Sequence, residues 1–390
     1  MPGKRKIVTT SPENSETPLE TLTSWVTPTR LFFVRNHFDV PRIDADAWCL
    51  RIHGCVEKPT TLDLEHLTAL PQRSVFATVE CAGNGRSFLR KPVAGVQWGA
   101  GAIGHAEWTG VPVRTVLEEA RMRPEAVEVV FEGADMGTES DHPEPMHFAR
   151  SLPLDKALHP DTLLALRMNG ELLDPNHGFP LRLFVPGWYG VAAVKWLTRI
   201  EVVDQPFRGY FQTMKYTIQC QSPQGRETVV VGTMAIKSEI IHPRSDEKLG
   251  LGTNRIFGIA CAGEEEVAGV EVSTDGGRTW SEAELIGSRG KYAWCLWEYL
   301  WQVAEPGSYD LLARARSDSG KTQTVKHNPL RGGYMINFSR PRQVEVATER
   351  RGEDRPGDVE ALLYDMDVFA EENIRHPLDV DLEYADGAGI

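Results

Sequence analysis

The stretch TVECAGNGR, residues 78–86, reads as the end of a strand followed by a glycine-rich turn. The apolar run stops at Cys81, and the two glycines after it permit left-handed backbone and the close approach of a ligand. Arg86 is placed to return toward the same cavity and to favour the thiolate. A lone cysteine, however, is more often a small buried hydrophobic residue. The stretch therefore predicts a thiol facing a cavity, and its neighbours must decide what that thiol does.

Two further clusters of polar residues follow short apolar runs. FFVRNHFDVP, residues 32–41, places an arginine, an asparagine and a histidine in a row, which is also a common composition for a solvated loop. DPNHGFPLRLFVPGWYG, residues 174–190, continues into VAAVKW and offers His177, Arg182 and Lys195 around turns. Cationic groups on loops suit a phosphate or pyrophosphate. Neither a Walker loop nor GxGxxG occurs, so a standard nucleotide site is not expected.

The composition argues against several classes of partner. The chain has 390 residues, 41% hydrophobic content and a formal net charge of −13, which is enough for two or three well-buried domains. A strongly acidic chain is not expected to bind nucleic acid or an anionic membrane. The basic N-terminal residues run into Ser, Pro and Glu where a signal peptide needs an apolar stretch, and no apolar run approaches the roughly 20 residues that span a bilayer. The sequence therefore predicts a cytoplasmic protein, or a periplasmic one if a leader has been removed. Six cysteines without a CxxC pair predict free thiols, and we find no haem or flavin motif.

The pattern of residues divides the chain into four parts. Residues 1–28 are rich in Ser, Thr, Pro and Glu and are expected to be mobile or draped over the surface. Residues 29–230 mix strand-like and helical runs, which predicts an α+β domain ending in a long connecting loop at 206–230. Residues 231–346 alternate in the manner of an immunoglobulin-like sandwich. Residues 347–390 form an acidic tail, with a short helix predicted at 358–366.

Four motifs in one order carry a resemblance to a known family. FxxRNHxxxP, a cysteine 46 residues after its arginine in CAGNxR, HGFPxRxxxPGxxG and VKW together resemble the molybdopterin-binding domain of the sulfite oxidase family. The resemblance covers about residues 28–345. It implies an α+β molybdopterin-binding domain of the sulfite oxidase fold, followed by an all-β immunoglobulin-like dimerisation domain. A homodimer is expected on the same ground.

The resemblance also implies roles for particular residues. Cys81 corresponds to the protein ligand of molybdenum, and Tyr216 to the active-site tyrosine. The arginines that correspond to the oxyanion pocket are Arg35, Arg86 and Arg331. The positions that correspond to contacts with the pterin and its phosphate are Asn36, His37, Asp135, His177, Arg182, Ala193, Val194 and Lys195.

The activity implied is oxidation of sulfite, or of a related small sulfur oxyanion, with a molybdenum-molybdopterin cofactor. Guanidinium groups suit such a compact dianion because each offers several charge-assisted hydrogen bonds in a fixed geometry. The electrons must then pass to a separate acceptor. Two alternatives remain open: a reductase of an oxyanion or S-oxide on the same fold, and a non-catalytic assembly protein with a vestigial pocket.

Three positions depart from the family pattern and bear on the substrate. Ala192 stands where many relatives carry an arginine, which removes one cationic contact to the cofactor phosphate. Gly85 stands where many carry an additional arginine, and Lys215 stands where an acidic residue is expected. The substrate is therefore less well determined than the cofactor.

Overall fold

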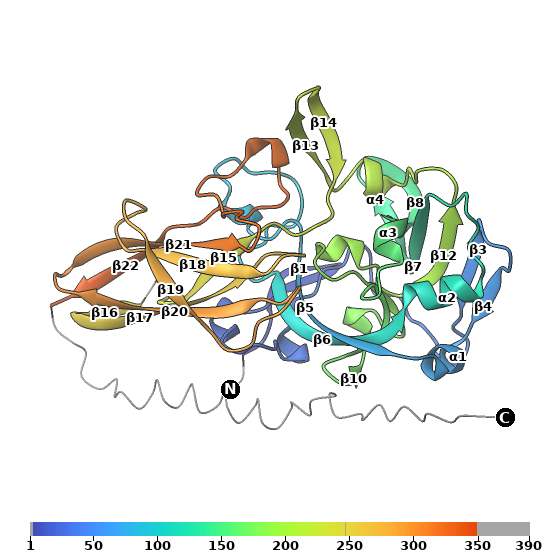
Figure 1. Cartoon of the computed structure of the whole chain (residues 1–390), viewed down its shortest axis with the longest axis horizontal. Coiled ribbons are helices and arrows are strands. Elements are labelled where there is room, and N and C mark those ends of the chain that lie inside the picture. Colours follow the sequence, from blue (N-terminus) through green and yellow to red (C-terminus); the bar gives the residue numbers. More distant parts are fainter. Residues whose placement is uncertain (1–2, 246, 349–390) are drawn as a thin grey trace, which may run out of the picture.

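The computed structural model describes residues 3–245 and 247–348. These residues form two bodies side by side, one that mixes strands with short helices and one made mostly of strands (Figure 1). The predicted acidic tail, apart from its first two residues, and its short helix at 358–366 lie outside the described residues. No helix in the described ranges is long and apolar enough to cross a membrane.

The first body contains two five-stranded sheets. One has the order β10-β9-β6-β5, with β11 also paired to β9, and its strands are β5 (Arg73–Glu80), β6 (Ile103–Pro112), β9 (Leu163–Met168), β10 (Glu171–Leu172) and β11 (Arg182–Phe184). The other has the order β4-β3-β12-β7-β8, and its strands are β3 (Leu50–Gly54), β4 (Thr60–Leu62), β7 (Glu128–Glu139), β8 (His142–Pro153) and β12 (Leu197–Val203). These strands contain the apolar runs from which strands were predicted.

Short helices join the strands of the first body. They are α1 (Leu64–Ala69), α2 (Val113–Glu119), α3 (Leu154–Ala157) and α4 (Tyr210–Thr213). α1 begins where the Asp63 carboxylate accepts the His66 amide at 2.8 Å, the usual way to satisfy a helix N-terminus. α2 buries Val113, Val116 and Leu117, whose spacing places them on one face toward the core. The α+β character of the first body is as predicted.

The second body is built from eight strands in the order β15-β17-β20-β19-β18-β21-β22-β16. They are β15 (Lys237–His242), β16 (Lys248–Gly250), β17 (Gly252–Cys261), β18 (Val267–Ser273), β19 (Ser281–Ile286), β20 (Cys295–Val303), β21 (Gly307–Ser317) and β22 (Arg342–Ala347). Alternate residues such as Ile256, Val270 and Trp297 are buried in its core. The prediction of an all-β second domain is confirmed.

The N-terminal segment, predicted to be either mobile or draped over the surface, is folded against the rest of the molecule. Residues 6–16 form the hairpin of β1 (Lys6–Thr10) and β2 (Glu13–Glu16), and Asn14 is buried. Trp25 also ties the segment to the second body, because each of the Trp25 and Trp294 indoles donates to the other residue's carbonyl, at 3.2 and 2.8 Å. Composition misses such packing because buried hydrogen bonds and one aromatic anchor can hold a polar segment in place.

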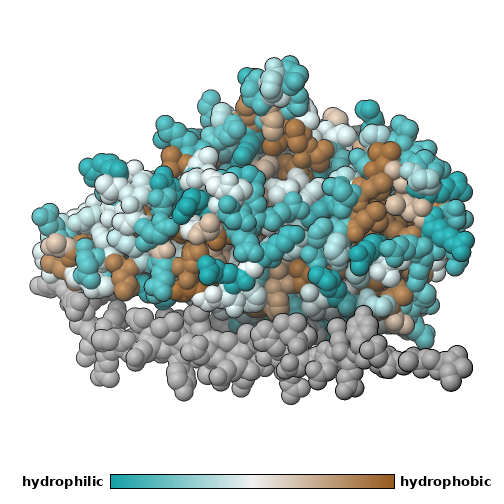
Figure 2. All heavy atoms as spheres, viewed as in Figure 1, coloured by the Kyte–Doolittle hydropathy of each residue, from teal (hydrophilic) through white to brown (hydrophobic). Residues whose placement is uncertain are grey.

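The predicted long loop at 206–230 is also mostly structured. After α4, β13 (Thr217–Ser222) and β14 (Gly225–Val230) form a hairpin that projects from the molecule (Figure 1). Gly225 closes its two-residue turn with a φ of 123°. Most residues of the two strands are polar, so the hydrophobic periodicity of the sequence does not reveal the hairpin. The face in Figure 2 is largely hydrophilic, with apolar patches beneath this hairpin and on both bodies.

Candidate active site

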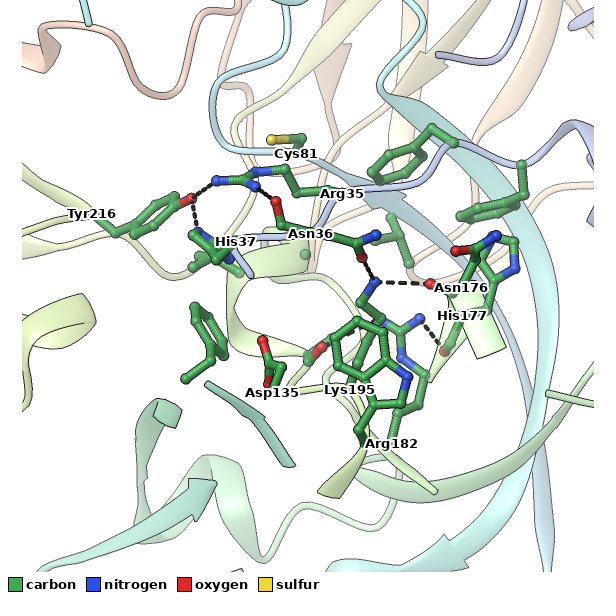
Figure 3. A pocket seen from close by; sticks show the side chains of 18 residues that line it. Arg35, Asn36, His37, Cys81, Asp135, Asn176, His177, Arg182, Lys195 and Tyr216 are labelled. Carbon is green, nitrogen blue, oxygen red and sulfur yellow. Dashed lines mark hydrogen bonds between the residues drawn. The ribbon is translucent and has the colours of Figure 1, made fainter. Parts of the chain in front are cut away.

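A cavity lies in the first body, where loops and strand ends from distant parts of the sequence meet (Figure 3). Its empty space of about 680 Å³ includes a part that is open to solvent. Its lining comprises Phe32, Phe33, Arg35, Asn36, His37, Val79, Cys81, Asp135, Phe148, Asn176, His177, Arg182, Gly190, Val191, Ala193, Lys195, Trp196 and Tyr216. The three sequence clusters therefore converge on one site.

Cys81 occupies the position predicted for it, directly after β5. Its amide donates to the Ala102 carbonyl at 2.9 Å, and its own carbonyl accepts the Asn84 amide at 2.9 Å. Gly85 in the turn has a φ of 86°, which L-residues with a side chain rarely adopt. A Cβ at Gly83 would lie 2.5 Å from the Arg86 guanidinium. Gly85 thus meets a backbone requirement of the turn that presents the thiol to the cavity, and a side chain at Gly83 would displace the Arg86 guanidinium.

Tyr216 is the centre of a hydrogen-bonded group on one side of the cavity. Its hydroxyl lies 2.6 Å from His37 Nε2 and accepts from the Arg35 guanidinium at 3.4 Å. Burial raises the pKa of Tyr216 to about 12, although Arg35 acts in the opposite direction. Burial and the neighbouring cations lower the pKa of His37 well below its usual value. At neutral pH the site therefore holds a protonated phenol and a neutral imidazole.

A second group lies deeper in the pocket and carries positive charge. Lys195 donates to the Asn36 side-chain oxygen and, at 2.8 Å, to the Asn176 carbonyl. Arg182 donates to the carbonyls of His177 and Ala193 at 3.0 and 3.2 Å. Burial lowers the pKa of Arg182 to about 10 and that of Lys195 well below its usual value. An anion bound here would offset the cost of burying these cations.

The polar atoms of the pocket fit a ligand rich in hydrogen-bonding groups. Four buried side-chain atoms of the pocket have no hydrogen-bond partner among the described residues: Asn36 Nδ2, Asp135 Oδ1, His177 Nε2 and Arg182 Nε. Buried polar groups are normally satisfied, so such atoms indicate a missing partner. Burial raises the pKa of Asp135 to about 6, with Lys195 opposing. A pterin ring offers donors and acceptors, and its phosphate would meet the cations.

Asp174 orients His177 within this group. Its carboxylate accepts from the His177 backbone amide at 2.9 Å and lies 2.8 Å from His177 Nδ1. The imidazole therefore keeps Nδ1 toward Asp174 and leaves Nε2 free for a ligand. Asp174 and Asn176 both belong to the DPNHGFP motif, although neither was predicted as a site residue. Asn14, whose side chain accepts from Arg35 at 3.2 Å, could not be found from sequence because it belongs to the N-terminal hairpin.

Three of the predicted residues, Arg86, Arg331 and Val194, are not among the residues that line the cavity. Arg86 donates instead to the carbonyls of Gly333 and Val96, the shortest contacts to each being 2.9 Å. Arg331 donates to the Met335 carbonyl at 3.1 Å and to the Asn337 side chain at 2.8 Å. Both guanidinium groups thus hold the 331–337 loop of the second body. Val194 packs in the hydrophobic core.

Two family models match successive parts of the chain. Residues 37–211 match the model of the oxidoreductase molybdopterin binding domain, and residues 228–337 match that of the Mo-co oxidoreductase dimerisation domain. The chain therefore contains a domain of the molybdopterin-binding oxidoreductase class, followed by a domain of the matching dimerisation class. It is 36% identical over 338 residues to mitochondrial sulfite oxidase of Rattus norvegicus, covering 82% of this chain and 61% of that protein.

Two other relatives narrow the family. Sulfite oxidase of Gallus gallus is 34% identical over 349 residues, covering 84% of this chain and 74% of that protein. The crystal structure of the sulfane dehydrogenase SoxCD from Paracoccus pantotrophus matches with a TM-score of 0.77 and 29% identity over 88% of each chain. The chain belongs to the sulfite oxidase family. It spans about three fifths of the length of the mitochondrial relative.

Proposed function

We propose that this protein oxidises sulfite, or a related small sulfur oxyanion, with a molybdenum-pterin cofactor. The observation that carries the proposal is that the Cys81 thiol, the Arg35 guanidinium and the Tyr216 hydroxyl line one cavity. A thiolate is a suitable ligand for a soft metal, and a guanidinium fork suits a compact oxyanion. When bound, the cofactor supplies oxygen-atom transfer and takes up two electrons.

Different residues around the cavity would bind different parts of the cofactor. Cys81 would be the protein ligand of the metal. Arg182, Lys195 and the backbone around Ala193 would hold the phosphate, because the buried Arg182 and the half-buried Lys195 place two cations in the same pocket. The unpartnered atoms of Asn36, Asp135 and His177 would pair with the pterin. The fit of the donor set to a polar, anionic ligand supports this assignment.

The substrate side of the cavity is arranged for an anion. Arg35 can offer its charge to the dianion, while the protonated Tyr216 can donate its hydroxyl proton to one oxygen. His37 stays neutral and fixes the orientation of the phenol through their 2.6 Å contact. Such prepositioned donors act most strongly where water is excluded.

The test is reduction of the metal centre by sulfite. Protein made in a host that synthesises molybdopterin should contain about one molybdenum per chain, and sulfite should bleach its visible absorption in a stopped-flow experiment. Loaded protein that sulfite does not reduce, but whose reduced form nitrate or an S-oxide reoxidises, would support a reductase instead. Loaded protein inert to all of these reagents would support the non-catalytic alternative.

The role of Cys81 has its own test. The variant Cys81→Ser should lose sulfite oxidation by at least a factor of about 10³, because an alcohol does not replace a thiolate as a soft-metal ligand. Cys220→Ser is the matched control, since Cys220 lies on the projecting hairpin and outside the cavity. Full activity in Cys81→Ser would refute the assignment.

A homodimer and an external electron acceptor complete the proposal. The match of residues 228–337 to a dimerisation domain supports association of two copies through the second body. Light scattering should give twice the mass of one chain, whereas a strict monomer would contradict it. Because the electrons must leave after each turnover, sulfite oxidation should depend on an added acceptor such as a cytochrome or ferricyanide.

A further inference from the structure

Arg150 is a buried cation that stands behind the active site rather than in it. It lies on β8, two residues after Phe148, so the alternation of the strand points both side chains to the same face. Phe148 lines the cavity. Arg150 is 1% exposed and forms no ion pair with any carboxylate in the part of the chain that the structure describes. Burying an arginine without an ion pair costs folding free energy, so the position of Arg150 needs a structural or functional reason.

The hydrogen bonds of Arg150 hold the segment that carries Tyr216. One terminal nitrogen donates to the Phe211 carbonyl in α4, and the other donates at 3.0 Å to the Val231 carbonyl just after β14. Tyr216 lies between these two points, and its own carbonyl accepts the Val231 amide at 2.8 Å. The arginine therefore fixes both sides of the loop from which the phenol projects.

Tyr216 needs such support because its backbone is strained. Its φ is 54°, a left-handed conformation that costs an ordinary residue about 1–2 kcal/mol. Strained conformations persist at functional sites when the surroundings over-determine them. The Arg150 guanidinium also lies 6.0 Å from the centre of the Tyr216 ring. Its charge adds to those of Arg35 and Lys195 in keeping the pKa of His37 low, after the larger effect of burial.

We propose that Arg150 is a positioning residue, which holds the Tyr216 hydroxyl against Arg35 and His37 without touching the substrate. The proposal rests on the proposed function only for its activity measurements. Lysine cannot reproduce the fork that reaches two carbonyls, so both the shape and the charge of arginine are needed.

The first test is structural and independent of the substrate. In a crystal structure of Arg150→Gln, the Tyr216 hydroxyl should leave hydrogen-bonding distance of His37 Nε2, with Cys81 and Lys195 in place. An unchanged contact would overturn the proposal. If Arg150→Gln does not fold, Arg150→Lys is judged by the same criterion.

The second test is a double-mutant cycle in the molybdenum-loaded protein. Arg150→Gln should lower kcat/KM for sulfite by a factor on the order of 10², as expected for misplacing a catalytic group, with molybdenum content unchanged. Adding Arg150→Gln to Tyr216→Phe should lower it little further, because both act through one hydroxyl. Fully additive losses would refute the proposal.

The control variant is Arg199→Gln, which removes an arginine paired with Glu132 on the same sheet and should leave kcat/KM for sulfite unchanged. Absence of sulfite reduction in the unmodified protein would refute the proposed function but leave the structural test valid.

Discussion

At the scale of single residues, the pocket brings several charged groups together in partly or fully buried positions. Lys195 has a pKa well below its usual value because of burial first and the neighbouring Arg182 second. Asp135 beside it has its pKa raised to about 6, again mainly by burial. Groups displaced from their usual pKa values in opposite directions commonly mark functional sites. Here they indicate a pocket adapted to a bound anion.

The substitution Lys195→Met should lower cofactor binding more than it changes stability. Removing the ammonium relieves its desolvation cost, but it leaves the Asn36 side-chain oxygen and the Asn176 carbonyl without this donor, so the stability of the cofactor-free protein should change by no more than about 1 kcal/mol. The same change should reduce molybdopterin retention about tenfold or more, because a phosphate contact is lost. Thermal unfolding of cofactor-free protein and molybdenum content after purification measure the two effects. Lys58→Met, at an exposed lysine, should change neither, and a Lys195 variant that kept its full molybdenum content would contradict this account.

At the scale of elements, the turn after β5 decides where the thiol lies. The strand ends at Glu80, and the chain must reverse within a few residues while Cys81 stays at the cavity. Gly85 makes this possible with its left-handed backbone, and a Cβ there would lie 3.2 Å from the Ile336 side chain of the second body. The turn is thus constrained both by its own backbone and by its neighbour.

Gly85→Ala should accordingly lower both the stability of the protein and its molybdenum content. A left-handed alanine costs about 1–2 kcal/mol, and the contact with Ile336 should also displace the turn and lower the molybdenum content. Gly320→Ala is a matched control, because Gly320 has a φ of 84° but an alanine methyl group there would meet nothing within 4 Å. It should share the loss of stability and keep its molybdenum. Full molybdenum content in Gly85→Ala would show that the turn tolerates the displacement.

At the scale of the whole molecule, the second body supports the active site from behind. Lys237, the first residue of β15, forms a buried 2.6 Å ion pair with Glu80, the residue before Cys81. Glu80 also accepts from the Asn84 side chain at 2.9 Å, within the turn itself. His105 lies between Trp25 of the N-terminal segment and Trp294 of the second body, with ring centres 4.8 and 5.6 Å away. The two bodies and the N-terminal segment therefore share one packed interface.

His105 should make the stability of this interface depend on pH. Burial lowers the pKa of His105 to about 3, whereas an unfolded histidine has a pKa near 6.5. Between these values the unfolded chain binds the extra proton, so stability is lost as pH falls below about 6.5. From pH 7 to pH 5 this should amount to about 2 kcal/mol. Denaturant unfolding at both pH values should show a smaller loss for His105→Gln, and an equal loss would contradict the assignment.

Much of the site follows from the sequence because local patterns record local requirements. The apolar run before Cys81, the glycines after it and the turns around His177 and Arg182 belong to short segments whose backbone is fixed by nearby residues. The mixed first domain and the all-β second domain also follow from the periodicity of apolar residues. These features can be predicted without knowing the tertiary contacts between the segments.

Only the tertiary structure decided which charged groups face the cavity. Arg86 and Arg35 are both arginines in promising motifs, yet Arg86 turns to the Gly333 carbonyl while Arg35 meets Tyr216. No sequence motif pointed to Arg150, because the residues whose carbonyls it contacts lie 61 and 81 residues away in the sequence. A long side chain pairs with whatever the fold places within its reach, and sequence spacing carries no record of that placement. The sequence thus determined the thiol turn and the cofactor class, and the fold selected the cations that complete the site.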